Sequence, residues 1–206
     1  ASIGPGNAGA VNIERESDLS GAVHTKGFLI LSGLLRFLLR LKHPMAFSAG
    51  IAFEQTYGGI DGDSASGAEI CCLISALTDL PIRQDLAMTG AVDQKGNILP
   101  VGAVSEKIEG FFEACQTVGA TGTQGVIIPA ANSREMMLRE DVLEAVGAGQ
   151  FMIYAVSNIY QALGLLLDRA PGEALDLEYT QDTILAIAQH RAHEYWEIAK
   201  SHRSSD

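Results

Sequence analysis

The chain has 206 residues, of which 47% are hydrophobic and 19% charged, and its formal net charge is −11 at pH 7. This length is enough for one domain with a buried core, or for one domain and an additional segment. The acidic balance argues against a nucleic-acid-binding surface, which needs clustered Lys and Arg. Because the first residue is Ala1 and not Met, we expect a fragment of a longer protein.

The cysteines and the most apolar stretch exclude two further classes of protein. Cys71, Cys72 and Cys115 are odd in number and two are adjacent, so no disulfide framework is expected and a reducing, cytoplasmic compartment fits. The apolar residues 27–42 contain two arginines and are too short to span a bilayer comfortably. They also lie too far from the N-terminus for a signal peptide. We therefore expect a buried helix here and no membrane partner.

Hydrophobic periodicity predicts strands that alternate with helices along most of the chain. The clearest pattern is the strict alternation over residues 45–57, which is typical of a strand. The other expected elements are a short strand at 11–13, a helix at 27–42, a helix from about Ser64 to Leu77, a hairpin over 84–102 that turns at residues 95–97, a helix from about Val104 to Val118, a strand at 124–130, one or two short helices within 132–147, a strand at 151–156 and a helix at 158–167. This order predicts an α/β or α+β domain with helices packed on a mixed sheet.

The composition changes after Pro171 and Gly172. We predict one domain over residues 1–170 and a polar, helical C-terminal tail over residues 171–206. His193 and Glu194 in this tail begin an HExxH zinc pattern, but residue 197 is Glu and not His. A solvated helix face is therefore favoured over a metal site. The chain has no phosphate-binding G-x-x-x-x-G-K-[ST] loop either, so we do not expect it to hydrolyse ATP.

The loop sequence DGDSAS at residues 61–66 contains the candidate nucleophile Ser64. The G-x-S-x-G elbow of α/β-hydrolases is excluded because Ser66 replaces its second glycine. The GDSGG motif of trypsin-like proteases belongs to a fold of two antiparallel barrels with an early catalytic histidine, and neither the length pattern nor the predicted helices of this chain fit that fold. A Ser–His–Asp triad is therefore not predicted. The alternative is structural, with Asp63 or Ser64 as the N-cap of the following helix.

Lys107 raises the expectation of catalysis. It falls within the apolar stripe of the predicted helix, together with Val104, Ile108 and Cys115. Burial of a lysine is costly and favours the neutral amine, which acts as a general base. In the alternative, only the aliphatic stem is buried and the ammonium reaches water. A Ser64–Lys107 dyad is thus possible, with backbone N–H groups of the glycine-containing loop for the oxyanion, although spacing alone leaves open whether the two side chains meet.

Three blocks of sequence carry a resemblance to a known family. They are DGDSASGAE, LPIRQDLAMTGAVDQKGNILPVGAVSEKIEGFFEAC and GVIIPAAN. In this order and separation they resemble the proteolytic domain of Lon-type ATP-dependent proteases, from about Val11 to Leu167. The branch with a GDSAS serine motif, which also has a VNIERE…HTKG segment, is the most similar. The more familiar branch has Pro in place of Asp63 and Gly in place of Ser66.

The resemblance implies a fold and a set of roles. It implies the Lon proteolytic-domain fold, with the first strand truncated at Ala1, and a serine endopeptidase that cleaves unfolded or damaged proteins. Ser64 matches the catalytic serine, Lys107 the catalytic lysine and Thr89 the threonine that orients it. Asp61 and Asp63 match acidic positions beside the serine and are expected to be supporting residues.

Family members also have partners and cofactors that this chain is not expected to contain. They fuse the proteolytic domain to an AAA+ ATPase and assemble as hexameric rings, so ATP and magnesium are expected only in such a parent protein. No cofactor or metal is expected in this chain. Two other functions stay open: a catalytically silent assembly or regulatory module with the Lon fold, and an amidase or acyl-transferring Ser–Lys enzyme.

Overall fold

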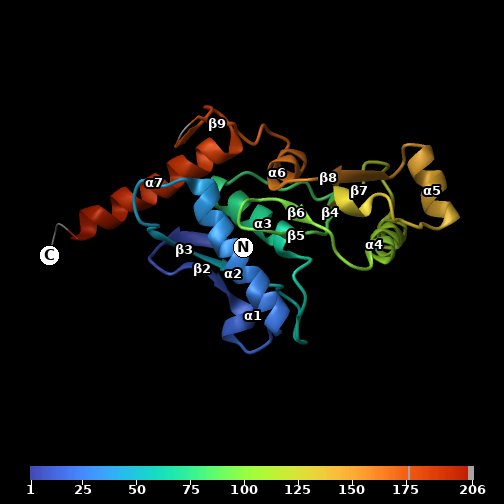
Figure 1. Cartoon of the computed structure of the whole chain (residues 1–206), viewed down its shortest axis with the longest axis horizontal. Helices are drawn as coiled ribbons and strands as arrows, with labels where there is room; N and C mark the ends of the chain where they lie inside the picture. Colours follow the sequence, from blue (N-terminus) through green and yellow to red (C-terminus); the bar gives the residue numbers. More distant parts are fainter. Residues whose placement is uncertain (176, 204–206) are drawn as a thin grey trace.

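The structure is a computed structural model that describes residues 1–175 and 177–203 (Figure 1). Helices and short strands alternate through most of this length. The helices are α1 (Ile13–Glu16), α2 (Ala22–Leu39), α3 (Ser66–Thr78), α4 (Val104–Val118), η1 (Ala130–Asn132, a 3-10 helix), α5 (Glu140–Gly147), α6 (Ile159–Leu167) and α7 (Ile184–Arg203). The strands are β1 (Ser2–Pro5), β2 (Gly9–Asn12), β3 (Phe47–Ile51), β4 (Leu86–Met88), β5 (Ala91–Val92), β6 (Ile98–Leu99), β7 (Gly125–Pro129), β8 (Met152–Val156), β9 (Ala174–Leu175) and β10 (Glu178–Tyr179).

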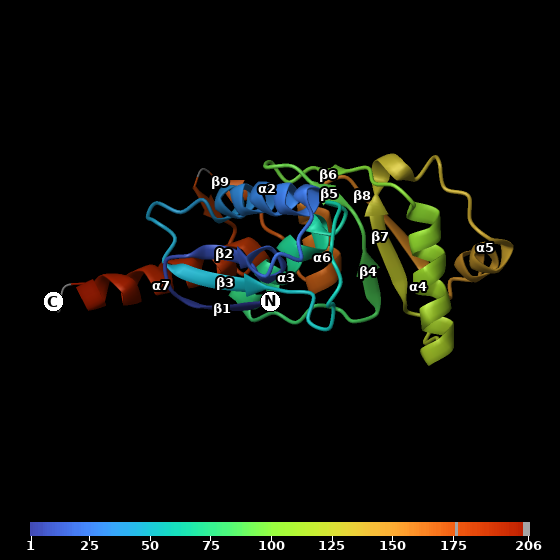
Figure 2. The same ribbon diagram turned by 90° about the horizontal axis from the view of Figure 1, so that it is seen from below.

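The buried apolar side chains form two clusters. The larger cluster lies among α2, α3, α6, α7 and the sheet β1-β3-β2, and the smaller one between α4, α5 and the sheet β4-β7-β8. Figure 2 shows α4 beside β7 at one end of the molecule and α7 at the other. This arrangement of helices on small, mixed sheets confirms the predicted fold class.

The burial of side chains in β3 and β7, the central strands of the two three-stranded sheets, confirms two of the predicted strands. In β3 the side chains of Phe47, Ala49 and Ile51 are buried and the two intervening residues are half-buried, as strict alternation requires. In β7 all five residues are buried, because this strand lies between two parallel neighbours, β4 and β8. A continuous apolar run is typical of such a central parallel strand.

The hairpin predicted over residues 84–102 is only half correct. Residues 91–99 do form it, since β5 and β6 pair antiparallel around Gly96, whose φ is +87°. The preceding strand β4 leaves the hairpin and pairs parallel with β7 instead. The chain changes sheets at Thr89 and Gly90, so the segment extends from one sheet to the other.

The apolar helix α2 begins at Ala22, five residues before its predicted start, and ends where Arg40 adopts a left-handed conformation. Among the described residues it is the one helix that is long and apolar enough to cross a membrane by length and composition. Its inner face, including Phe28, Leu31 and Leu38, is part of the larger cluster. A core helix therefore explains its apolar composition.

The predicted helix of the C-terminal segment is present as α7, but it is more than a surface helix. Its first half contributes Ile184, Leu185, Ala188 and Ala192 to the larger cluster, where α7 packs on α3. Because two of these four residues are alanines, the sequence of α7 shows no strongly apolar stripe that would predict a buried face. The division at residue 170 stays a prediction, and residues 176 and 204–206 of the predicted tail lie outside the described residues.

We predict that this packing makes α7 essential for stability. Ile184 is fully buried, whereas Ile198 on the same helix is 42% exposed. Ile184→Ala should lower the free energy of unfolding by about 2–4 kcal/mol, because it leaves a cavity in the core. Ile198→Ala should cost less than about 1 kcal/mol. Urea unfolding of the two variants measures the difference, and equal effects would show that α7 is not part of the core.

Candidate active site

Ser64 lies in the turn that leads into α3, and its backbone is fixed by residues 89 and 90. The Ser64 carbonyl oxygen accepts hydrogen bonds from the Gly90 N–H at 2.8 Å and from Thr89 Oγ1 at 3.4 Å. The Gly67 N–H donates in turn to the Gly90 carbonyl at 3.0 Å. The start of α3 is thus joined to the segment that connects β4 with β5.

The close approach of these two segments depends on glycine at position 67. A Cβ atom at Gly67 would lie 2.9 Å from the Gly90 carbonyl oxygen and 2.6 Å from the terminal methyl of Met88. Any side chain would therefore push the two backbones apart. No role was predicted from the sequence for Gly67 or Gly90, although each lies within one of the sequence blocks that carry the resemblance.

Lys107 reaches the serine from the first turn of α4. Its Nζ lies 3.1 Å from Ser64 Oγ and 3.3 Å from Thr89 Oγ1. The structure therefore brings Ser64, Thr89 and Lys107 together from three separate parts of the sequence. Lys107 Nζ is within hydrogen-bond distance of both hydroxyl oxygens, and its distance to Ser64 Oγ is the geometry that a nucleophile and its base require.

The expectation that Lys107 is buried is wrong. Lys107 is exposed, and Ser64 is half-buried. The buried face of α4 consists of Val104, Ile108, Phe112 and Cys115. This face is narrower than the predicted stripe, so Lys107 lies at its edge and its ammonium reaches both Ser64 and water, as in the alternative interpretation.

The two acidic candidates of the serine loop have different surroundings. Asp61 Oδ1 accepts hydrogen bonds from the backbone N–H groups of Val23 and His24 at 3.1 Å and of Gly62 at 2.8 Å. These bonds lower the pKa of Asp61, the Gly62 bond most. Asp61 is therefore the cap of α2, supplied from a distant loop.

Asp63 is exposed, and no ion pair joins it to Lys107 within residues 1–175 and 177–203. Neither Asp63 nor Ser64 caps α3 with its side chain, so the structural alternative for this loop is wrong. The N–H groups of Ser64 and Ala65 donate to no acceptor in the described part of the chain. They are thus available to an oxygen of a bound molecule.

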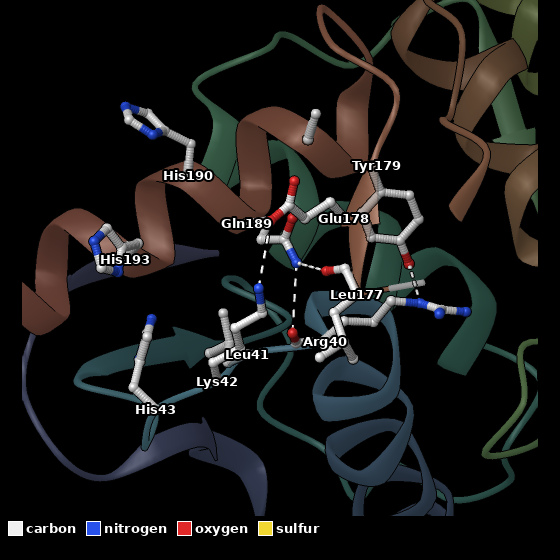
Figure 3. A pocket seen from close by; sticks show the side chains of 11 residues that line it. Arg40, Leu41, Lys42, His43, Leu177, Glu178, Tyr179, Gln189, His190 and His193 are labelled. Atoms are coloured by element: carbon white, nitrogen blue, oxygen red, sulfur yellow. Dashed lines mark hydrogen bonds and ion pairs between the residues drawn. The ribbon is translucent and has the colours of Figure 1, made fainter. Parts of the chain in front are cut away.

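A second group of polar residues lines a cavity of about 410 Å³ between the end of α2, the β9–β10 hairpin and α7 (Figure 3). Neither Ser64 nor Lys107 lines it. Gln189 Nε2 donates to the Leu39 and Leu177 carbonyl oxygens, which fastens the hairpin to α2. His190 and His193 each lie beside a glutamate one turn later, at 3.4 and 3.9 Å. The described residues contain no group of three side chains that could hold a metal ion.

A comparison with protein-family models finds one match for this chain. Residues 56–169, which include Ser64, Thr89 and Lys107, match the Lon protease (S16) C-terminal proteolytic domain. The chain belongs to this family. Its fold is that of a Lon proteolytic domain, and membership of the family supports a peptidase activity.

Curated relatives agree with this assignment. The chain is 45% identical over 187 residues to a Lon protease homologue of Escherichia coli K12, and the match covers 89% of this chain and 32% of the relative. It is 47% identical over 180 residues to a homologue of Haemophilus influenzae, with 86% and 30% covered. It is 41% identical over 121 residues to the archaeal Lon protease of Thermococcus kodakarensis, with 59% and 17% covered. The chain thus spans about a third, or less, of the length of these relatives.

A buried polar cluster, which the sequence did not reveal, lies behind the serine helix of this Lon domain. It consists of Asn12, Glu14, His24 and Glu69, from β2, α1, α2 and α3, and each residue is at most 4% exposed. Glu14 Oε1 accepts from the Phe53 N–H at 2.6 Å. The other oxygen of Glu14 and both oxygens of Glu69 have no hydrogen-bond partner among the described residues.

The hydrogen bonds of Asn12 determine which atoms can donate to Glu69. Asn12 Oδ1 accepts from the Arg15 N–H at 2.8 Å, so Nδ2 of the same amide faces His24 Nε2 at 3.1 Å and donates to it. His24 Nε2 is therefore an acceptor and offers no proton to Glu69 Oε1, 3.7 Å away. Burial, and to a lesser degree the charge of Glu14, raises the pKa of Glu69 to about 7. Glu69 is a carboxylic acid below this pH.

We predict that Glu69 makes stability depend on pH. Its pKa rises from an ordinary 4.5 to about 7 on folding, so the folded chain holds an extra proton between these values. Its contribution to the free energy of unfolding is full below pH 4.5 and decreases by about 3 kcal/mol as the pH rises through 7. Glu69→Gln cannot ionise and should remove this dependence. It should gain about 3 kcal/mol relative to wild type between pH 4.5 and 8.

Chemical denaturation across this pH range provides the measurement. Glu144→Gln is the matched control, because Glu144 is exposed on α5 and the substitution is the same. Its difference from wild type should stay constant with pH. If the Glu69→Gln difference is equally constant, Glu69 does not bind the proton.

Proposed function

We propose that the chain is the proteolytic part of a Lon-type serine endopeptidase with a Ser64–Lys107 dyad. One observation carries the proposal: Lys107 Nζ lies 3.1 Å from Ser64 Oγ and 3.3 Å from Thr89 Oγ1. A lysine can act as the base for a serine without a histidine. Family membership supports a peptide as the substrate, rather than the small amides or acyl donors of other Ser–Lys enzymes.

The chemistry proceeds in two steps. The neutral Lys107 amine takes the proton of Ser64 Oγ as this oxygen attacks the carbonyl carbon of the peptide. The lysine then gives the proton to the leaving amine, the C–N bond breaks and an acyl-enzyme remains. In the second step Lys107 takes a proton from water, the resulting hydroxide attacks the acyl group, and the proton returns to Ser64 Oγ as the acid product leaves.

Other residues around the dyad have supporting roles in this proposal. The N–H groups of Ser64 and Ala65, which have no acceptor among the described residues, stabilise the oxyanion. Thr89 is 7% exposed and orients the lysine through its hydroxyl. Asp61 holds the serine loop on α2 through its three backbone hydrogen bonds. Asp63 faces solvent beside the dyad, where an incoming polypeptide would contact it.

The wider function belongs to a longer protein. In this proposal the parent contains a AAA+ ATPase, which uses ATP and magnesium to unfold polypeptides and deliver them to a hexameric ring of proteolytic domains in the cytoplasm. The chain itself needs no cofactor. The match to about a third of the bacterial relatives supports a larger parent, and their names describe them as homologues of Lon protease.

The rival function is a catalytically silent module that only assembles or regulates. The positions of Ser64 and Lys107 favour the enzyme, because a module without catalysis has no need of a lysine amine at hydrogen-bond distance from a serine hydroxyl. Covalent labelling distinguishes the two, since a fluorophosphonate reacts only with an activated serine.

We predict that both members of the dyad are required for this labelling. Ser64→Ala should abolish it, and Lys107→Ala should slow it at least about 1,000-fold, because the serine loses its base. Hydrolysis of casein by the parent protein should fall in parallel. Lys95→Ala, which removes an exposed lysine from the β5–β6 turn, is the control and should react at the wild-type rate. Wild-type labelling of the Lys107 variant would exclude the dyad.

Thr89 provides a second, separate prediction. Thr89→Val keeps the shape of the side chain but removes the hydroxyl to which Lys107 Nζ donates. Labelling should slow between about tenfold and 100-fold, because the amine is no longer held toward Ser64. Thr89→Ser keeps the hydroxyl and should retain most of the rate. If Thr89→Val reacts as fast as Thr89→Ser, the hydroxyl of Thr89 does not hold the amine toward Ser64.

A further inference from the structure

Ser66 occupies the position that distinguishes the GDSAS motif from the G-x-S-x-G and Lon patterns with glycine there. It is the first residue of α3 and only 2% exposed. Its Oγ accepts a hydrogen bond from the Val92 N–H at 3.1 Å, and both partners are buried. The hydroxyl is therefore not a second nucleophile, since it faces β5 and not the solvent.

The Val92 N–H needs this acceptor. Val92 is 3% exposed and part of the larger cluster, so water does not replace a lost partner. A buried N–H group without an acceptor is destabilising, and nearly all such groups in proteins are paired. Glycine or alanine at position 66 would leave the Val92 N–H unpaired or force β5 to move.

This bond is one of four that tie the start of α3 to residues 89–92. The other three are the Gly90 N–H to the Ser64 carbonyl at 2.8 Å, the Gly67 N–H to the Gly90 carbonyl at 3.0 Å and Thr89 Oγ1 to the Ser64 carbonyl at 3.4 Å. The anchored positions are therefore Ser64 itself, through its carbonyl oxygen, and Ser66 and Gly67 after the intervening Ala65. Side chains make two of the four, those of Ser66 and Thr89, and the bond of Ser66 is the shorter one, so substitution of Ser66 can remove it without changing the backbone.

We propose that Ser66 is a positioning residue that holds Ser64 Oγ within reach of Lys107. This inference rests on the proposed function. Without the Ser66 hydroxyl, the start of α3 keeps its bonds to residues 89 and 90 but loses its bond to β5, so the turn at residues 63–65 can shift relative to β5 while Lys107 stays fixed on α4. A small displacement between a nucleophile and its base costs a large factor in rate, because reacting groups must be held within about 0.5 Å.

The test compares two serines on the same helix. Ser66→Ala removes the bond to β5 near Ser64, and Ser75→Ala removes the bond from Ser75 Oγ to the Leu80 carbonyl near the other end of α3. Ser66→Ala should slow fluorophosphonate labelling between about tenfold and 100-fold, through the maximal rate and not through reagent affinity. Ser75→Ala should lower the unfolding temperature to a similar extent but leave labelling unchanged. Ser66→Thr, which keeps a hydroxyl, should recover part of the rate.

Amide hydrogen exchange tests the anchoring without any activity. Ser66→Ala should speed exchange in peptides that cover residues 62–66 and 90–93, and Ser75→Ala should not. Equal labelling rates for Ser66→Ala and wild type, or unchanged exchange in both peptides, would overturn the positioning role. A wild-type chain that is not labelled would contradict the proposed function instead, and the exchange measurement would still decide whether Ser66 anchors the loop.

Discussion

The candidate site depends on the hydrogen bonds that residues 89–92 make to the start of α3. On one side of this segment, β4 pairs with β7, and the ladder continues through the Thr89 N–H to the Ile127 carbonyl. On the other side, Val92 is buried in the larger apolar cluster. Ser64 is bonded to this segment, and Lys107 belongs to the helix that covers the smaller cluster. The distance between the two side chains is thus set by how the clusters are joined.

Because these hydrogen bonds join distant segments, a single residue such as Gly67 can affect the position of Ser64. Each of the backbone bonds contributes only about 1 kcal/mol to stability. Together they fix the serine loop to the segment that connects β4 with β5. Gly67 allows the approach, because a Cβ atom there would collide with the Gly90 carbonyl. A substitution at such a position would displace Ser64 even where the fold survives.

Much of the fold could be predicted because it follows local periodicity. The strict alternation around Phe47 identified β3, and the apolar stripe of α4 gave its limits at Val104 and Val118. Partners between distant segments could not be predicted this way. The pairing of β4 with β7, and the core face of α7 made by Ala188 and Ala192, depend on contacts that no local pattern records.

In the candidate site, too, the residues of local motifs could be predicted, whereas contacts between distant elements could not. Ser64, Thr89 and Lys107 were selected from motifs and a resemblance, and the structure brings them together. The burial argument for Lys107 failed, because the apolar face of α4 is narrower than its sequence pattern. The cluster around Glu69 was missed altogether. It requires Asn12, Glu14 and His24 from three other elements, and a single glutamate in an apolar helix gives no sign of them.

The two aspartates of the serine loop show how one short sequence can place two negative charges near Lys107 without an ion pair that would oppose its proposed role as a base. An ionised carboxylate paired with Lys107 would favour the charged ammonium, which cannot accept a proton. Asp61 is engaged by three backbone N–H groups, two of them at the start of α2, so its charge stabilises that helix. Asp63 is exposed, and in the described chain it forms no ion pair with Lys107. Gly62, with a φ of +89°, separates the two residues and lets the chain turn between them. The Lys107 amine thereby stays within hydrogen-bond distance of the hydroxyl oxygens of Ser64 and Thr89 and of no carboxylate among the described residues.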